Sequence, residues 1–100
     1  MEFDENLRFE FDWDINKARS NLSKHKISFD EGKTVFNDPF TITIDDLEHS
    51  LIEDRYIDIG RSAKGRLITV SYTEHGDTIR IISCRKATLT EQNNYEKPSD

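Results

Sequence analysis

The chain has 100 residues, of which 34% are hydrophobic and one is cysteine. This length predicts a single domain spanning residues 1–100 with a core of its own, and one cysteine excludes an internal disulfide. No run approaches the roughly 20 apolar residues of a membrane span, and residues 1–14 lack the basic start and apolar run of a signal peptide, so we expect a cytoplasmic protein.

Charge is unevenly distributed along the sequence. The net charge is −6, from 14 basic and 20 acidic side chains. Residues 1–14 hold six of these acids and one base, and we expect residues 1–8 to form an acidic, flexible N-terminus. A globally acidic protein is a poor non-specific binder of nucleic acid, so any such contact requires a local cationic patch.

The first predicted elements are a strand and a helix. The segment FEFDW at 9–13 alternates apolar and acidic side chains, which is typical of a short edge strand. Asp14 then stands where its carboxylate can cap a helix that starts at Ile15 and ends near His25. One face of this helix holds Ile15, Ala18, Leu22 and either His25 or Lys26, and we expect that face to pack while the basic residues Lys17, Arg19 and Lys24 point outward.

A capping box predicts the second helix. Ser28 and Glu31 are spaced so that the hydroxyl and the carboxylate each satisfy an amide at a helix start. This helix is expected to end before Asn37. Its predicted buried stripe is Phe29, Gly32, Val35 and Phe36. A strand over 40–44 and a polar loop follow.

Three β-rich runs, at 55–61, 66–73 and 78–85, predict an antiparallel meander. The connections at 62–65 and 74–77 each hold one glycine for a residue with positive φ.

Alternation along the middle strand assigns its two faces. Ile68, Val70 and Tyr72 are expected to meet the helices, whereas Leu67, Thr69, Ser71 and Thr73 form a half-exposed set. The last strand carries isoleucine on both faces, at Ile79, Ile81 and Ile82. A bulge and burial on both sides explain this pattern equally well.

A second capping box, from Thr88 to Glu91, opens a short C-terminal helix that extends toward Tyr95, and residues 97–100 are a frayed tail. The predicted fold class is therefore α+β: an antiparallel sheet with two N-terminal helices packed on one face and a short C-terminal helix.

Cationic side chains are concentrated in the meander. Residues 55–86 hold seven bases and three acids. The seven are Arg55, Arg61, Lys64, Arg66, Arg80, Arg85 and Lys86. This local excess indicates a sheet surface that faces a polyanion.

Several separated segments resemble the BrnT family of ribonuclease toxins. They are FDWDINKARSNLSKHKISFDEG, TVFNDPF, the EHS at 48–50, EDRYIDIGRSAKGRLITV, YTEHGDTIRIISCRKAT and E..NYE, and the resemblance extends from residue 9 to about residue 95. Two positions depart from the usual pattern. Lys26 stands where a glycine often follows the Lys-His pair, and Cys84 stands where alanine often occurs. Neither belongs to the cationic set.

The resemblance implies a RelE-like fold and a metal-independent endoribonuclease of a type II toxin-antitoxin system that inhibits translation. It also implies inhibition by a BrnA-like antitoxin, a ribbon-helix-helix protein through which the pair would reach operator DNA. No cofactor is implied.

Metal-independent RNA cleavage uses the 2′-hydroxyl of the substrate as nucleophile, so the enzyme must move protons and stabilise a dianionic phosphorane. Arginine suits the second task because its planar fork pairs with two phosphate oxygens. We expect Arg61 and Arg80 to form this clamp. The residues expected to bind RNA around it are Arg55, Lys64, Arg66, Arg85 and Lys86. All of these cations have an alternative role as rim charges that pair with nearby acids.

Candidates for proton transfer are Lys24, His25, His49 and Glu53. His25 has an alternative role in capping the first helix, and Glu53 in orienting an arginine. No histidine or cysteine pair has metal-ligand spacing, so no metal site is predicted.

A rival hypothesis for the whole chain is a non-catalytic, decayed toxin that acts as a co-repressor through its antitoxin.

Overall fold

The computed structural model describes residues 9–49 and 54–97. The predicted flexible N-terminus and most of the frayed tail lie outside these residues. The elements are β1 (Glu10–Asp12), α1 (Ile15–His25), α2 (Phe29–Lys33), the 3₁₀ helix η2 (Thr34–Asn37), β2 (Ile42–Asp45), the 3₁₀ helix η3 (Leu47–His49), β3 (Arg55–Arg61), β4 (Leu67–His75), β5 (Thr78–Lys86) and α3 (Leu89–Glu96).

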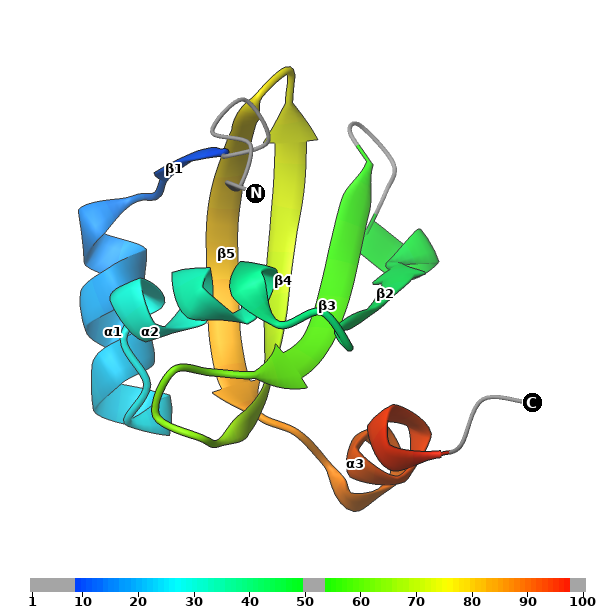
Figure 1. Ribbon diagram of the computed structural model, residues 1–100. Coiled ribbons are helices and arrows are strands. Elements are labelled where there is room, and N and C mark those ends of the chain that lie inside the picture. The colour runs from blue at the N-terminus through cyan, green and yellow to red at the C-terminus, as the bar shows by residue number, and fades with distance from the viewer. Residues whose placement is uncertain (1–8, 50–53, 98–100) are drawn as a thin grey trace, which may run out of the picture.

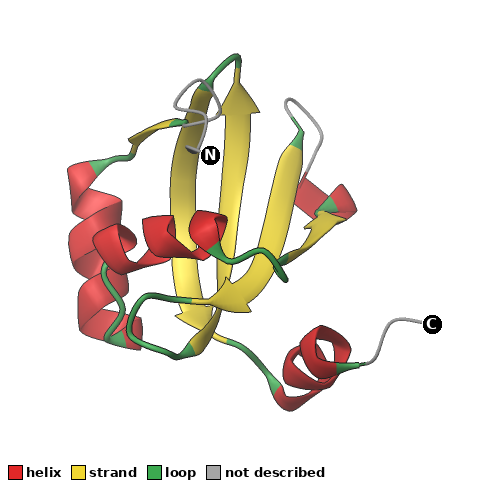
Figure 2. Cartoon of the chain, viewed as in Figure 1, coloured by secondary structure: helices red, strands yellow, loops and turns green. Residues whose placement is uncertain are grey.

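The strands form one sheet in the order β1-β5-β4-β3-β2. β1 runs parallel to β5 and the other pairings are antiparallel. α1, α2 and η2 cover one face of this sheet, which we call the helix face (Figures 1 and 2). α3 follows β5, lies apart from these helices and contacts β3. The predicted α+β class is confirmed.

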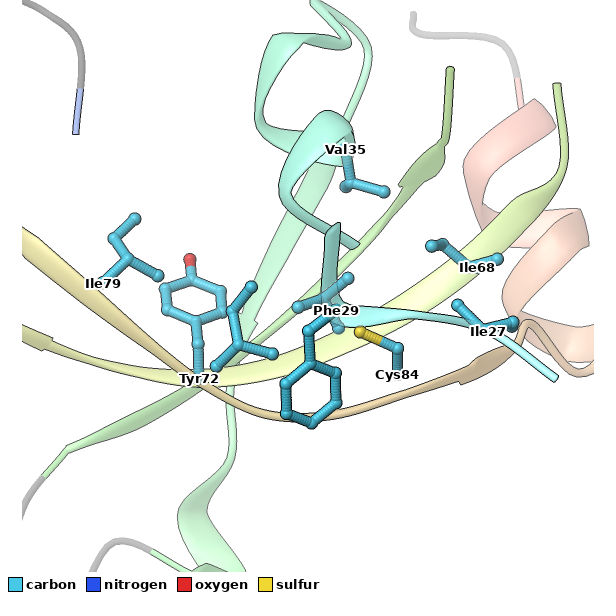
Figure 3. Packing of buried hydrophobic residues seen from close by; sticks show 9 residues of the cluster. Ile27, Phe29, Val35, Ile68, Tyr72, Ile79 and Cys84 are labelled. Carbon is cyan, nitrogen blue, oxygen red and sulfur yellow. The ribbon is translucent and has the colours of Figure 1, made fainter. Parts of the chain in front are cut away.

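The core lies between the helix face and the segment from α1 to η2. Ile27, Phe29 and Val35 pack there against Ile68 and the other buried strand residues (Figure 3). Gly32 is required at this contact because a Cβ at this position would overlap the sulfur of Cys84. The predicted buried stripe is confirmed for Phe29, Gly32 and Val35, and Phe36 is half-buried against the core. Val35 and Phe36 lie in η2, because α2 already ends at Lys33.

α1 begins as predicted but packs differently. The Asp14 carboxylate accepts hydrogen bonds from the amides of Asn16 and Lys17, at 2.8 and 3.2 Å. The expected packing of Ile15 and Leu22 is wrong, since they are 59% and 50% exposed.

Asn21 is the buried residue of α1. Its side-chain amide donates to the carbonyl of Ile27 at 2.9 Å and accepts from the amide of Cys84 at 3.0 Å. These bonds tie α1 to β5, and they satisfy two main-chain groups that would otherwise be buried without partners.

Only half of the first predicted capping box forms. The Ser28 hydroxyl accepts from the amide of Glu31 at 3.0 Å, but the Glu31 carboxylate binds Ser62 and Arg66 instead. It thereby attaches the β3–β4 hairpin to α2. The second box, between Thr88 and Glu91, forms completely.

A bulge explains the isoleucines on both sides of β5. Ser71 pairs with Ser83 while Tyr72 pairs with Ile81, so Ile82 is an extra residue on β5. Because of this extra residue, Ile81 before the bulge and Cys84 after it both face the helices.

The predicted faces of β4 are partly confirmed. Ile68, Val70 and Tyr72 join the core as expected. On the other side, Thr69 and Thr73 were expected to be half exposed but are buried, at 2% and 1%. For Thr69 the cause is Glu91 of α3, which binds its hydroxyl.

Candidate functional site: a cationic end and an open sheet face

The face of the sheet that α1 and α2 leave uncovered is called here the open face. Pairing in the sheet places Arg55, Thr73 and Arg80 side by side on it, in one row across β3, β4 and β5. A lower row contains Thr69 and Arg85. α3 reaches the open face at this lower row, through Glu91.

Charges are segregated between the two ends of the sheet. One end, called here the cationic end, is formed where β3 and β5 finish, where β4 begins and where α1 terminates (Figure 1). Its basic residues are Lys24, Lys26, Arg61, Lys64, Arg66, Arg85 and Lys86. The acids Glu10, Asp45, Asp46, Asp54, Glu74 and Asp77 lie at the other end. Four acids, Glu31, Asp38, Glu91 and Glu96, also lie at the cationic end. Its seven bases still leave a local excess of positive charge in a chain of net charge −6.

Arg61 is held at the cationic end by three contacts. Its guanidinium donates to the carbonyl of Gly65 at 3.1 Å and lies over the ring of Tyr95, 5.7 Å from the ring centroid. Its main-chain amide donates to Asp38 at 2.8 Å, and the Tyr95 hydroxyl donates to the same carboxylate oxygen at 2.6 Å. The head group of Arg61 therefore rests on an aromatic surface while remaining exposed.

The pKa values of the supporting pair are shifted in opposite directions. Partial burial and then the hydrogen bond to Asp38 raise the pKa of Tyr95. Burial opposes ionisation of Asp38, but hydrogen bonds from Tyr95 and the Arg61 amide lower its pKa. Asp38 is thus a stable anion and Tyr95 a stable proton donor at neutral pH.

A pocket of about 320 Å³ lies at the cationic end, between the base of the β3–β4 hairpin and α3. It is lined by Arg61, Arg66, Leu67, Lys86, Ala87, Gln92 and Glu96. Arg61 and Lys86 have no salt bridge to any acid in the part of the chain that the structure describes. The pocket can therefore offer two positive charges to an anion.

Two predicted RNA-binding arginines are committed to carboxylates. Arg66 forms a two-pronged pair with Glu31, which lowers the pKa of that carboxyl despite its burial. Arg85 binds both oxygens of Glu91, at 2.8 and 2.9 Å, and holds the pKa of Glu91 at about 2. Both guanidinium groups stabilise the fold, by fixing the hairpin and α3.

Arg80 lies far from Arg61. Arg80 pairs across the sheet with Thr73, whereas Arg61 pairs with Leu67, six residues earlier on β4. At about 3.3 Å per residue this separates them by roughly 20 Å along the strand. Arg80 also binds Asp12, at 3.1 Å. The two arginines predicted to form one clamp therefore contact different phosphates if both bind RNA.

The remaining predicted residues are placed as follows. Lys24 and His25 lie in the last turn of α1. The hydrogen bond from Arg66 to the carbonyl of Lys26, at 3.3 Å, places the end of this helix next to the β3–β4 hairpin. Lys64, in the hairpin turn, is exposed, with its ammonium 4.0 Å from Glu31. His49 is the last residue of η3, and Glu53 lies outside the described residues.

Sequence reasoning missed Tyr95 and Asp38 as neighbours of Arg61. Tyr95 follows Arg61 by 34 positions and Asp38 precedes it by 23, and no local pattern joins them. Among residues 9–49 and 54–97, no group of three or more His, Cys, Asp or Glu side chains is arranged to hold a metal ion. None of the described helices has the length and apolarity to cross a membrane.

The architecture and the charge distribution define a small α+β domain with one helix-covered sheet face and a cationic end. Residues 13–91 match the family model described as "Ribonuclease toxin, BrnT, of type II toxin-antitoxin system". The chain therefore belongs to the BrnT family, as its sequence segments indicate, and membership implies an antitoxin partner.

The fold has a solved counterpart. The crystal structure of the ribonuclease toxin BrnT from Brucella abortus superposes with a TM-score of 0.62 at 21% identity, covering 81% of this chain and 99% of that one. No curated protein sequence is significantly similar to the chain.

Proposed function

We propose that this chain is an endoribonuclease that cleaves RNA without a metal ion, by attack of a 2′-hydroxyl on the adjacent phosphate. Cleavage of RNA would inhibit translation until an antitoxin neutralises the protein. The observation that carries the proposal is the pocket at the cationic end. Arg61 and Lys86 both line it, and neither forms a salt bridge within the described residues, although Glu96 lines the same pocket.

Arg61 is the residue best placed to stabilise the phosphorane. Its guanidinium is exposed, and it is held by Tyr95 and by the Gly65 carbonyl rather than by an acid. A guanidinium that is already oriented needs little rearrangement as charge develops on the phosphate oxygens. Lys86 adds a second positive charge from the end of β5.

For proton transfer we propose two residues in the last turn of α1, which lies near the hairpin that carries Arg66. His25 is half-buried at the end of α1, and Lys24 is exposed beside it. An imidazole can act as a general base and as a general acid, so His25 suits both removal of the 2′ proton and its return to the leaving 5′-oxygen. His49 and Glu53 remain candidates from the sequence for the same steps.

The antitoxin is proposed to be a BrnA-like ribbon-helix-helix protein. Family membership supports an antitoxin partner. The type of antitoxin, and contact with operator DNA through it, are extensions of the sequence resemblance.

The decisive experiment incubates the purified, antitoxin-free protein with a defined RNA in excess EDTA and maps the cut sites and the end groups. We expect products that end in 2′,3′-cyclic phosphate, and a loss of roughly 100-fold in rate for Arg61→Ala. Arg19→Ala is the matched control, because Arg19 is an exposed arginine on α1, outside the cationic end.

Each alternative outcome has a clear meaning. Cleavage that stops in EDTA refutes metal independence, and full activity of Arg61→Ala refutes the role of Arg61. RNA that stays intact with the wild-type protein favours the non-catalytic co-repressor.

A further inference from the structure

The open face repeats one side-chain motif. Thr69 lies opposite Arg85 and Thr73 lies opposite Arg80, with both threonines on β4 and both arginines on β5. The two threonines are buried to nearly the same degree. The two threonines are four positions apart on β4, roughly 13 Å along the strand. The open face thus carries two similar arginine–threonine pairs.

The lower pair shows what the motif binds. Arg85 donates from two nitrogens to the two oxygens of Glu91, at 2.8 and 2.9 Å. The Thr69 hydroxyl donates to one of these oxygens at 3.0 Å. An arginine fork and a threonine hydroxyl together thus hold an oxyanion against the sheet.

The upper pair holds no oxyanion that both of its residues share. The hydroxyl oxygen of Thr73 is buried and has no hydrogen-bond partner, although buried polar side-chain atoms are nearly always paired. Arg80 makes a single contact with Asp12, and both side chains are about half exposed. Such a pair is weak and easily exchanged. Arg55 flanks Thr73 on the other side, from β3.

We propose that Thr73, between Arg80 and Arg55, forms a second subsite on the open face for a phosphodiester group of the RNA backbone. The subsite deepens the proposed function and rests on it. Arg80 exchanges Asp12 for phosphate and keeps a charge-assisted bond, while the Thr73 hydroxyl donates to a second phosphate oxygen.

This subsite positions the substrate rather than acting on the reacting bond. It lies roughly 20 Å along the sheet from Arg61, so the phosphate it holds is not the one that is cut. Its expected contribution is to binding affinity and to the register of the RNA strand, with little effect on the rate of cleavage of bound RNA.

The test compares Thr73→Val with Thr69→Val, the same change on the same strand and face. Thr73→Val should not lower the melting temperature, because the hydroxyl has no partner to lose. Thr69→Val should lower it, because it removes one hydrogen bond to Glu91. The ligand is a fluorescent 2′-O-methyl RNA oligonucleotide, which cannot be cleaved because it has no free 2′-hydroxyl. Binding is measured by anisotropy.

We expect Thr73→Val to weaken binding about tenfold, equivalent to about 1.4 kcal/mol, while Thr69→Val binds as the wild type does. Thr73→Ser, which keeps a hydroxyl, should restore affinity and guards against a folding defect in the valine variant. The rate of a saturated, single-turnover cleavage reaction should be unchanged in Thr73→Val.

Other results overturn the subsite. Equal affinity of Thr73→Val and wild type removes it, even if the wild-type protein cleaves RNA. Weaker binding of Thr73→Val to hexaglutamate, with RNA binding intact, reassigns it to a carboxylate of a protein partner. Failure of the wild-type protein to bind or cleave any RNA rejects the proposed function itself.

Discussion

Replacing Arg66 with alanine separates its structural role from the RNA-binding role predicted for it. Glu31 is 5% exposed. It accepts two hydrogen bonds from Arg66 and one from Ser62, the latter at 2.7 Å. Removing one partner of a buried ion pair costs about 3–5 kcal/mol, because the remaining charge is left without compensation.

The lower end of that range applies to Arg66→Ala. The Arg66 side chain is 34% exposed, and Ser62 and Lys64 remain near the carboxylate. We expect a loss of about 3 kcal/mol in the free energy of unfolding. For a domain of this size the melting temperature then falls by roughly 12–24 °C. Urea denaturation followed by circular dichroism measures the first quantity, and a thermal scan the second.

The pH dependence gives an independent check. Hydrogen bonds from Arg66 lower the pKa of Glu31, with burial opposing. The stabilisation is therefore complete above the usual pKa of a glutamate, about 4.3, and is lost as pH falls through the lower folded-state pKa. Arg66→Ala should flatten this acid dependence.

Lys64→Ala is the control for loss of charge, since Lys64 is 69% exposed and its removal should cost less than about 1 kcal/mol. A double variant, Glu31→Gln with Arg66→Met, should be more stable than Arg66→Ala because no buried charge is left unpaired. Arg66→Ala with wild-type stability and weakened RNA binding would refute this reasoning.

Two further predictions concern buried contacts on the helix face. Gly32→Ala should destabilise the protein by about 1–3 kcal/mol because the new Cβ overlaps the Cys84 sulfur. In urea titrations the double variant with Cys84→Ala should recover this stability. A single variant as stable as the wild type would contradict the contact. Asp58 is 4% exposed and accepts from Thr43 and Tyr72, and burial raises its pKa. Wild-type stability should therefore fall as pH rises from the usual aspartate pKa of about 3.9 through the raised pKa of Asp58. Asp58→Asn, which has no charge to bury, should gain on the wild type over that rise in paired urea titrations. A stability difference that does not change with pH would show that the buried charge carries no penalty.

Local signals predicted the elements, and long-range contacts decided how their side chains are used. Asp14, Thr88 and the glycines of the two hairpins act through neighbours in sequence, and each performs the role that its spacing indicates. Glu31 has equally good capping spacing, but a hairpin 31 to 35 residues away supplies stronger partners for its carboxylate.

The same limit applies to the packing of α1 and to the site. An asparagine is a poor choice for a buried helix position on hydropathy alone. Asn21 is buried because a loop carbonyl and a strand amide both need its side chain. Likewise, the sequence supplied the cations of the site, but only strand register shows that Arg61 and Arg80 are far apart.

Segregation of charge removes the objection that an acidic protein cannot hold RNA. Electrostatic interactions between exposed charges are screened over about 8 Å at physiological ionic strength. β4 spans nine residues from the cationic end to the acidic turn, roughly 30 Å, so a phosphate beside Arg61 is almost insensitive to Asp77 or Glu74. Near Arg80 the situation differs, because Asp12 is its direct neighbour. Asp12 thus competes with phosphate for Arg80 and limits how far along the open face an RNA strand can be bound.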